Sequence, residues 1–146
     1  MHTRHEAVIR AHPAAILALA ADVESWPALH PAYRWCRVVE RGAHSVLFEM
    51  GGRIRGWPAR WTARQERFPD EGRVVFRHVA GITRGMVVEW RLRPVPGGTH
   101  VAIVHDLVLP WPVVGGMVSD VIIGPVFIDW IAARTLQGLR RVLEAR

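Results

Sequence analysis

Apolar and polar residues alternate in short runs between residues 33 and 109, and turn residues such as Gly51-Gly52 separate these runs. Such alternation is typical of antiparallel strands with one buried face, and it predicts about six strands. Ahead of them, residues 5–11 predict a first strand. Residues 13–21 predict a helix that Pro13 is suited to open, and residues 22–29 a second short helix.

The end of the chain has a different period, with apolar residues every three to four positions, as in an amphipathic helix. This stripe consists of Ile128, Ile131, Ala132, Thr135, Leu136, Leu139, Val142 and Leu143. The helical pattern begins after Pro112, and Gly124-Pro125 should kink or restart it. The order of elements predicts an α+β fold in which a curved antiparallel sheet wraps around a long C-terminal helix.

Residues 107–128 are apolar enough to suggest a membrane span. They contain Pro110, Pro112, Asp120 and Pro125, however, so a buried helix is the better interpretation. The 146 residues suit one domain, spanning 1–146, that can bury a core of its own.

All 19 basic residues are arginines, and the net charge is +6. Such a charge attracts anionic partners, but the arginines do not cluster with aromatic residues, so nucleic-acid binding is not expected. Cys36 is the one cysteine, which leaves neither an internal disulfide nor a zinc motif. The sequence has no phosphate-binding or dinucleotide-binding motif, so we expect no cofactor. Without a signal segment at its start, the chain is expected to be cytoplasmic.

Polar residues fall on the predicted inner face of several strands. Gln65 and Arg67 continue an apolar face of one strand, His78 lies on the next, and His105 on the last. Arg67 either reaches solvent at the end of its strand or lines a cavity, because an inward guanidinium cannot be buried alone. A single inward histidine is usually a satisfied core residue. Several together, with seven tryptophans, favour an apolar cavity with a few polar groups for a small ligand.

Three segments resemble a known family. They are residues 22–29 followed by Tyr33, then Trp61 with Glu66-Arg67 and Asp70, and finally residues 90–98. Together they resemble bacterial aromatase/cyclases of type II polyketide synthesis, of the tetracenomycin type, in the START/Bet v 1-like superfamily. The resemblance covers about residues 22 to 144. It implies the helix-grip fold with an internal cavity.

The resemblance also implies a reaction, the intramolecular aldol closure and dehydration of a poly-β-ketone chain on an acyl carrier protein. In that family, residues matching Trp26, Tyr33, Arg67 and Trp90 are implicated in binding or catalysis. The sequence departs from the family it resembles at two positions. His30 matches a position where that family has phenylalanine, and Gln65 matches one where it has serine. The expected catalytic groups are Arg67 for the oxyanion, Tyr33 as a donor, and His30, or else His78, as the base.

The expected substrate-binding residues are Trp26, Trp61, Gln65, Phe76, His78, Met86, Trp90, His105 and Ile128. An acidic carrier protein would suit a basic patch formed by Arg53, Arg55, Arg84 and Arg93, although these arginines also serve as ordinary solubilising charge. The alternative function is a carrier that holds a lipid, quinone or polyketide in the same cavity without turnover.

Overall fold

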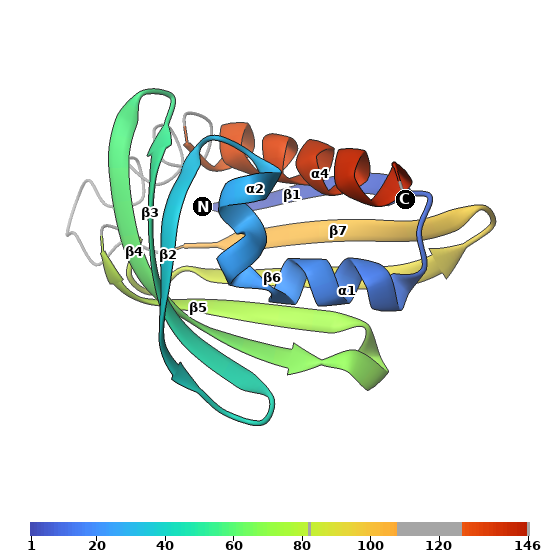
Figure 1. Cartoon of the computed structure of the whole chain (residues 1–146), viewed down its shortest axis with the longest axis horizontal. Coiled ribbons are helices and arrows are strands. Elements are labelled where there is room, and N and C mark those ends of the chain that lie inside the picture. Colours follow the sequence, from blue (N-terminus) through green and yellow to red (C-terminus); the bar gives the residue numbers. More distant parts are fainter. Residues whose placement is uncertain (82, 108–126, 146) are drawn as a thin grey trace.

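A computed structural model describes residues 1–81, 83–107 and 127–145 of the chain. Its architecture is one seven-stranded antiparallel sheet with helices on one side (Figure 1). The predicted α+β class and the predicted run of six strands after residue 33 are confirmed. The predicted helix over residues 113–126, with its kink at Gly124-Pro125, lies outside the described residues.

The strands run in the order β1-β7-β6-β5-β4-β3-β2, and every neighbouring pair is antiparallel. Their bounds are β1 His2–Ile9, β2 Tyr33–Arg41, β3 Ser45–Ile54, β4 Trp57–Phe68, β5 Arg73–Gly81, β6 Val87–Val95 and β7 Gly98–Asp106. β1 begins three residues earlier than predicted, because His2 and Thr3 pair with the end of β7 although they are polar.

The helices are α1 (Pro13–Ala21), the single-turn η1 (Val23–Ser25), α2 (Trp26–Leu29) and α4 (Asp129–Glu144). α1 has its predicted bounds. Pro13 occupies its first turn, and the ring Nδ1 of His12 caps it by accepting the Ala14 amide at 3.1 Å. α4 packs against β1, α1 and α2. Figure 1 shows the β2–β4 end of the sheet curling around these helices. None of the described helices is both long and apolar enough to cross a membrane.

Side-chain alternation along the strands separates core from surface as predicted. The inner face buries Phe48, Met50, Ala63, Val74 and Trp90, each at most 2% exposed. The apolar stripe of α4 closes over this face with buried residues that include Ile131, Leu136, Leu139 and Leu143. Burial of this stripe is the main force that holds the helix against the sheet.

Gly138 lets α4 approach α2 closely. A Cβ atom at this position would lie 2.6 Å from the backbone oxygen of Leu29, closer than any real Cβ contact. The same oxygen accepts a hydrogen bond from Arg141 at 2.7 Å, which ties the two helices together. The position of α4 over the sheet therefore depends on the absence of a side chain at residue 138.

Replacing Gly138 with alanine should destabilise the protein, although alanine is favoured over glycine by about 1 kcal/mol in a helix interior. The new methyl group must push α4 away from a backbone atom, so we expect a net loss of about 1–3 kcal/mol in urea unfolding. Gln137→Ala, on the exposed neighbouring position, is the control and should change stability by less than about 0.5 kcal/mol. An alanine variant as stable as the parent would contradict the packing described here.

Candidate functional site

A cavity of about 470 Å³ lies between the sheet and the helices, within the size range of small-ligand sites. Its wall is mostly apolar and draws on β2 to β7, α2 and α4. The lining residues are Trp26, Tyr33, Phe48, Ile54, Trp57, Pro58, Ala59, Arg60, Trp61, Phe76, His78, Thr83, Met86, Val88, Trp90, Ile103, His105, Phe127, Ile128, Ile131, Ala132 and Thr135. The structure therefore brings most of the sequence-predicted site residues to one hollow.

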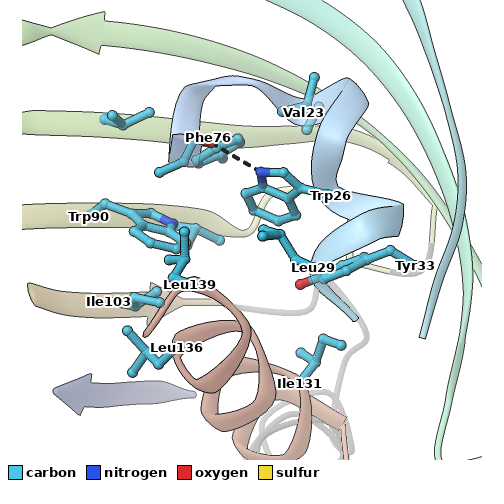
Figure 2. Packing of buried hydrophobic residues seen from close by; sticks show 14 of the residues in the cluster. Val23, Trp26, Leu29, Tyr33, Phe76, Trp90, Ile103, Ile131, Leu136 and Leu139 are labelled. Atoms are coloured by element: carbon cyan, nitrogen blue, oxygen red, sulfur yellow. Dashed lines mark hydrogen bonds between the residues drawn. The ribbon is translucent and has the colours of Figure 1, made fainter. Parts of the chain in front are cut away.

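Trp26 organises the aromatic part of the wall (Figure 2). Its ring centroid lies 5.1 Å from that of Tyr33, 5.6 Å from Phe76 and 6.0 Å from Trp90, all in tilted or edge-on geometry. The indole Nε1 donates to the backbone oxygen of Ala20 at 3.2 Å, which fixes the ring from α1. Rigid aromatic faces of this kind suit a planar or polyene ligand.

Tyr33 and Thr135 form a buried polar pair in this wall. The two hydroxyl oxygens are 2.6 Å apart, and the Thr135 hydroxyl donates to the backbone oxygen of Ile131 at 2.8 Å. Because that bond uses the only threonine proton, Tyr33 is the donor in the pair. Burial raises the pKa of Tyr33 well above its ordinary value, so the phenol stays protonated.

His78 contributes a neutral imidazole near the mouth of the cavity. Its Nδ1 lies 2.9 Å from the Thr83 hydroxyl, and its ring stacks on Trp61 with centroids 6.3 Å apart. Burial lowers the pKa of His78 from 6.5 to about 4, because it disfavours the charged ring. His78 is therefore uncharged at neutral pH.

His105 is the most deeply buried imidazole of the lining, with 6% of the residue exposed. Burial first, and then the repulsion that His5 and His78 exert when they are protonated, lower the pKa of His105 to about 3, while Asp106 acts in the opposite direction. Its Nδ1 has no hydrogen-bond partner among the described residues. A buried polar atom without a partner is rare in proteins, so this nitrogen calls for an explanation beyond the packing of the core.

The prediction that Arg67 lines this cavity is wrong. Arg67 lies instead at a second, shallower depression with Asp22, Glu24 and Arg41, and its Nη2 donates to the Ala43 backbone oxygen at 3.2 Å. The alternation placed it on the correct face of β4. That strand, however, runs on past the cavity to a part of the sheet that α1 covers, so the solvent-reaching alternative is the one found.

Gln65 is also on the inner face but not in the cavity wall. It is fully buried, and its Nε2 donates to the backbone oxygen of Ala21 at 2.8 Å, at the end of α1. A long polar side chain under a helix end satisfies a carbonyl that the helix leaves free. The expected substrate contact of Gln65 is thus replaced by a structural one.

His30 follows α2 and is not among the residues that line the cavity. Its Nδ1 accepts the Ala32 amide at 3.0 Å, and its ring meets Trp130 edge-on at 5.8 Å. Partial burial and the nearby charges of Arg134 and Arg141 lower its pKa. The prediction of His30 as the base beside Tyr33 does not agree with the cavity lining, which includes Tyr33 but not His30.

Thr135 and Thr83 are cavity residues that the sequence did not single out as a site. Thr135 interrupts the apolar stripe of α4, and this polar residue on a buried helical face was the available signal. Thr83 gave no signal, because it lies in a turn between strands. Trp57 is a lining residue that is 64% exposed, and it lies at the mouth of the cavity beside the β3–β4 turn. The described residues contain no cluster of three or more side chains suited to hold a metal ion.

Thr135→Val should lower the free energy of unfolding by about 1–3 kcal/mol, because it leaves the buried Tyr33 hydroxyl without an acceptor. The double variant Tyr33→Phe/Thr135→Val should regain most of this loss, since both polar groups are then absent. Urea unfolding of the three proteins measures the effect. A double variant no more stable than Thr135→Val alone would contradict the hydrogen-bonded pair.

The free energy of unfolding should fall as the pH drops below about 6.5. His78 and His105 then bind protons in the unfolded chain but stay neutral in the folded protein, because burial lowers the pKa of both rings. For His78, the lowered pKa contributes on the order of 3 kcal/mol above pH 6.5, lost progressively down to about pH 4. Urea unfolding at several pH values should show this decline. The decline should be smaller in His105→Phe than in the parent protein, and equal to the parent's in the exposed control His44→Gln. A flat profile in the parent protein would refute the assignment.

Comparisons with known proteins place this architecture in a family. Residues 9–127 match the family described as polyketide cyclase/dehydrase and lipid transport. A bifunctional cyclase/dehydratase of the actinorhodin polyketide synthase from Streptomyces coelicolor is 34% identical over 90 residues, which are 60% of this chain and 28% of that protein. The chain thus matches well under two thirds of the length of this relative.

Solved structures share the fold at low sequence identity. The protein TTHA0849 from Thermus thermophilus matches with a TM-score of 0.85 at 22% identity, covering 99% of this chain and 98% of the other. The Zhui aromatase/cyclase from Streptomyces sp. R1128 matches with a TM-score of 0.76 at 19% identity, covering 97% of this chain and 95% of the other. A START superfamily protein from Mycobacterium smegmatis matches with a TM-score of 0.78 at 16% identity, covering 99% of this chain and 97% of the other. These matches confirm the predicted helix-grip fold, and the chain belongs to the polyketide cyclase/dehydrase and lipid transport family.

Proposed function

We propose that this chain is an aromatase/cyclase that closes and aromatises a ring in a poly-β-ketone held on an acyl carrier protein. The observation that carries the proposal is the aromatic cavity of about 470 Å³, in which polar groups stand at only a few places. The family match and the cyclase/dehydratase relative support the same reaction class.

The reaction asks little of the protein beyond shape and proton handling. A proton leaves a carbon between two carbonyl groups, the resulting enolate attacks another carbonyl of the same chain, and the alkoxide takes up a proton. Loss of water then yields the aromatic ring. Holding the folded chain with the reacting carbons in contact is worth up to about 7–11 kcal/mol in favourable cases. The rigid wall of Trp26, Phe76 and Trp90 is suited to this positioning.

His105 is the proposed base. Its imidazole is neutral at physiological pH and therefore open to a proton, and it lies in the wall of the cavity. Burial makes it a weak base in the empty protein. A developing enolate beside the ring would offset the cost of the positive charge, because opposite charges stabilise one another strongly in a dry cavity. His78, near the mouth and bonded to Thr83, is the second proposed proton carrier.

Tyr33 is the proposed donor to the oxygen that becomes negative. It stays protonated, and its hydroxyl lies in the cavity wall beside Thr135. On ligand binding it would exchange the threonine acceptor for the ligand oxygen, which carries more charge and is the stronger acceptor. The proposal gives no catalytic role to Arg67 or His30, because both lie outside the cavity lining.

An acidic carrier protein is the proposed partner at the cavity mouth. Arg53, Arg55 and Arg84 are exposed on the two turns that supply the mouth residues Trp57 and Thr83. This positive rim complements an acidic surface and suits delivery of a tethered chain. Arg93 lies at the other end of the sheet, beside the β6–β7 turn, and is not part of this patch. The cytoplasmic location belongs to the same proposal, and the free thiol of Cys36 suits a reducing compartment.

The carrier function remains the alternative, because the family description also includes lipid transport. A carrier uses the same cavity and differs only in lacking turnover. Binding alone therefore does not separate the two functions, and the rate of ring closure does.

Replacing His105 with phenylalanine should lower the rate of ring closure by about 100-fold or more, because proton transfer is lost while the aromatic wall is kept. The assay incubates a carrier-bound poly-β-ketone with the protein and follows the cyclised product by mass spectrometry. His44→Gln, exposed and remote from the cavity, is the matched control. Quenching of the cavity tryptophans by a hydroxylated naphthalene measures binding, which should change by less than a few fold.

Two results would count against the proposal. Ring closure by His105→Phe at the parental rate would remove His105 from the mechanism. Tight binding by the parent protein, with no acceleration of ring closure over the uncatalysed reaction, would favour the carrier function.

A further inference from the structure

Three buried polar atoms without partners belong to neighbouring residues of β1 and β7, close to the start of α4. They are Thr3 Oγ1, His5 Nδ1 and His105 Nδ1, and each lacks a hydrogen-bond partner within the described part of the chain. Thr3 is the register partner of His105, and His5 lies two residues further along the same inner face of β1. The rings of His5 and His105 touch edge-on, with centroids 6.3 Å apart.

Such a cluster is unusual, because buried polar groups nearly always have a partner. A buried water molecule typically makes about three hydrogen bonds to groups that are otherwise unsatisfied. A hydroxyl and two ring nitrogens, contributed by two paired strands, provide that number of partners. The cluster therefore has the composition of an internal water site.

On its far side the cluster leads to solvent. Nε2 of His5 lies 3.0 Å from Oδ1 of Asp129, the first residue of α4. The exposed fraction rises along this line, from 6% for the His105 residue to 19% for the His5 side chain and 48% for that of Asp129. A carboxylate oxygen so close to Nε2 repels a ring lone pair, so the proton of the neutral His5 ring belongs on Nε2 and Nδ1 is left to accept.

We propose that Thr3 and His5 hold a water molecule against His105 and, with Asp129, form a proton path between the cavity and solvent. The inference rests on the proposed function, since it concerns the proton that His105 takes from the ligand. His105 accepts this proton at one ring nitrogen and releases one from Nδ1 to the water. The water passes a proton to His5 Nδ1, and His5 releases its Nε2 proton to Asp129 and solvent.

Each group in this path gains one proton and loses one, so none of them keeps a charge. The negative charge left in the cavity is that of the enolate, which the proposed donor Tyr33 stabilises. The reverse sequence brings one proton back from solvent into the cavity, where it replaces the proton that Tyr33 gave to the alkoxide, and it restores the original tautomers. Thr3, His5 and Asp129 touch neither the ligand nor the reacting atoms, and they are positioning residues that act through His105.

Thr3→Val is the sharpest test, because valine keeps the shape of threonine and removes only the hydroxyl. We expect kcat for ring closure to fall about tenfold or more with KM changed less than twofold, and Thr3→Ser to restore it. His5→Leu should give a similar loss, and the double variant should be no worse than the poorer single variant, because both residues serve one path.

His100→Gln is the matched control. His100 lies on the same strand as His105, pairs with Glu6 on the outer face, and has a side chain 20% exposed, close to the 19% of His5. Its replacement should leave kcat unchanged. Parental kcat values in both Thr3→Val and His5→Leu would overturn the proton path.

A second measurement does not depend on turnover. With ¹⁵N-labelled histidine, nuclear magnetic resonance follows exchange of the ring N–H of His105 with solvent. We expect exchange to slow about tenfold or more in Thr3→Val and not in His100→Gln. Equal exchange rates would overturn the path even in a protein that closes rings, and slowed exchange in a protein without ring-closing activity would leave the path standing while the proposed function fails.

Discussion

The contact between α2 and α4 decides where the interior is filled and where it stays hollow. Gly138 allows the backbone of α4 to reach Leu29, and Arg141 binds the same carbonyl oxygen. Tyr33, four residues after Leu29, then meets Thr135 one turn before Gly138. These contacts hold α4 beside α2 and the start of β2, at the cavity that Tyr33 and Thr135 line.

The two ends of the inner face consequently have different roles. Under α1 the face is packed, and Gln65 is used to satisfy the end of that helix. Nearer the β3–β4 hairpin the same face is lined by aromatic rings around a cavity. Because the wall is apolar, each polar group left in it is costly unless it has a partner or a ligand. The neutral histidines and the Tyr33–Thr135 pair are therefore the groups on which function should depend.

Local sequence patterns predicted much of this arrangement. The two-residue alternation assigned the inner faces of the strands, including Trp61, Phe76, His78, Trp90 and His105, because a strand has only two faces. The errors of this prediction arise where the alternation shows that a residue faces inward but does not show whether a helix or the cavity lies over it. Arg67 and Gln65 share a face with Trp61, yet β4 is 12 residues long, and its last residues lie near the end of α1 and not at the cavity. His30 was wrongly expected in the cavity, because its place in the sequence, just after a helix, does not determine where its ring points.

The sequence by itself determined the order of elements, the buried side of each strand and the apolar stripe of α4, since these follow from periods of two and three to four residues. It also carried the family resemblance. Only the tertiary structure decided which inward residues border the cavity, because that depends on where each helix crosses the sheet. The same holds for the meeting of Thr3, His5 and His105, whose partners lie about 100 residues apart in the chain and are joined by strand pairing. Contacts between distant segments depend on how whole elements pack, and no local pattern records this.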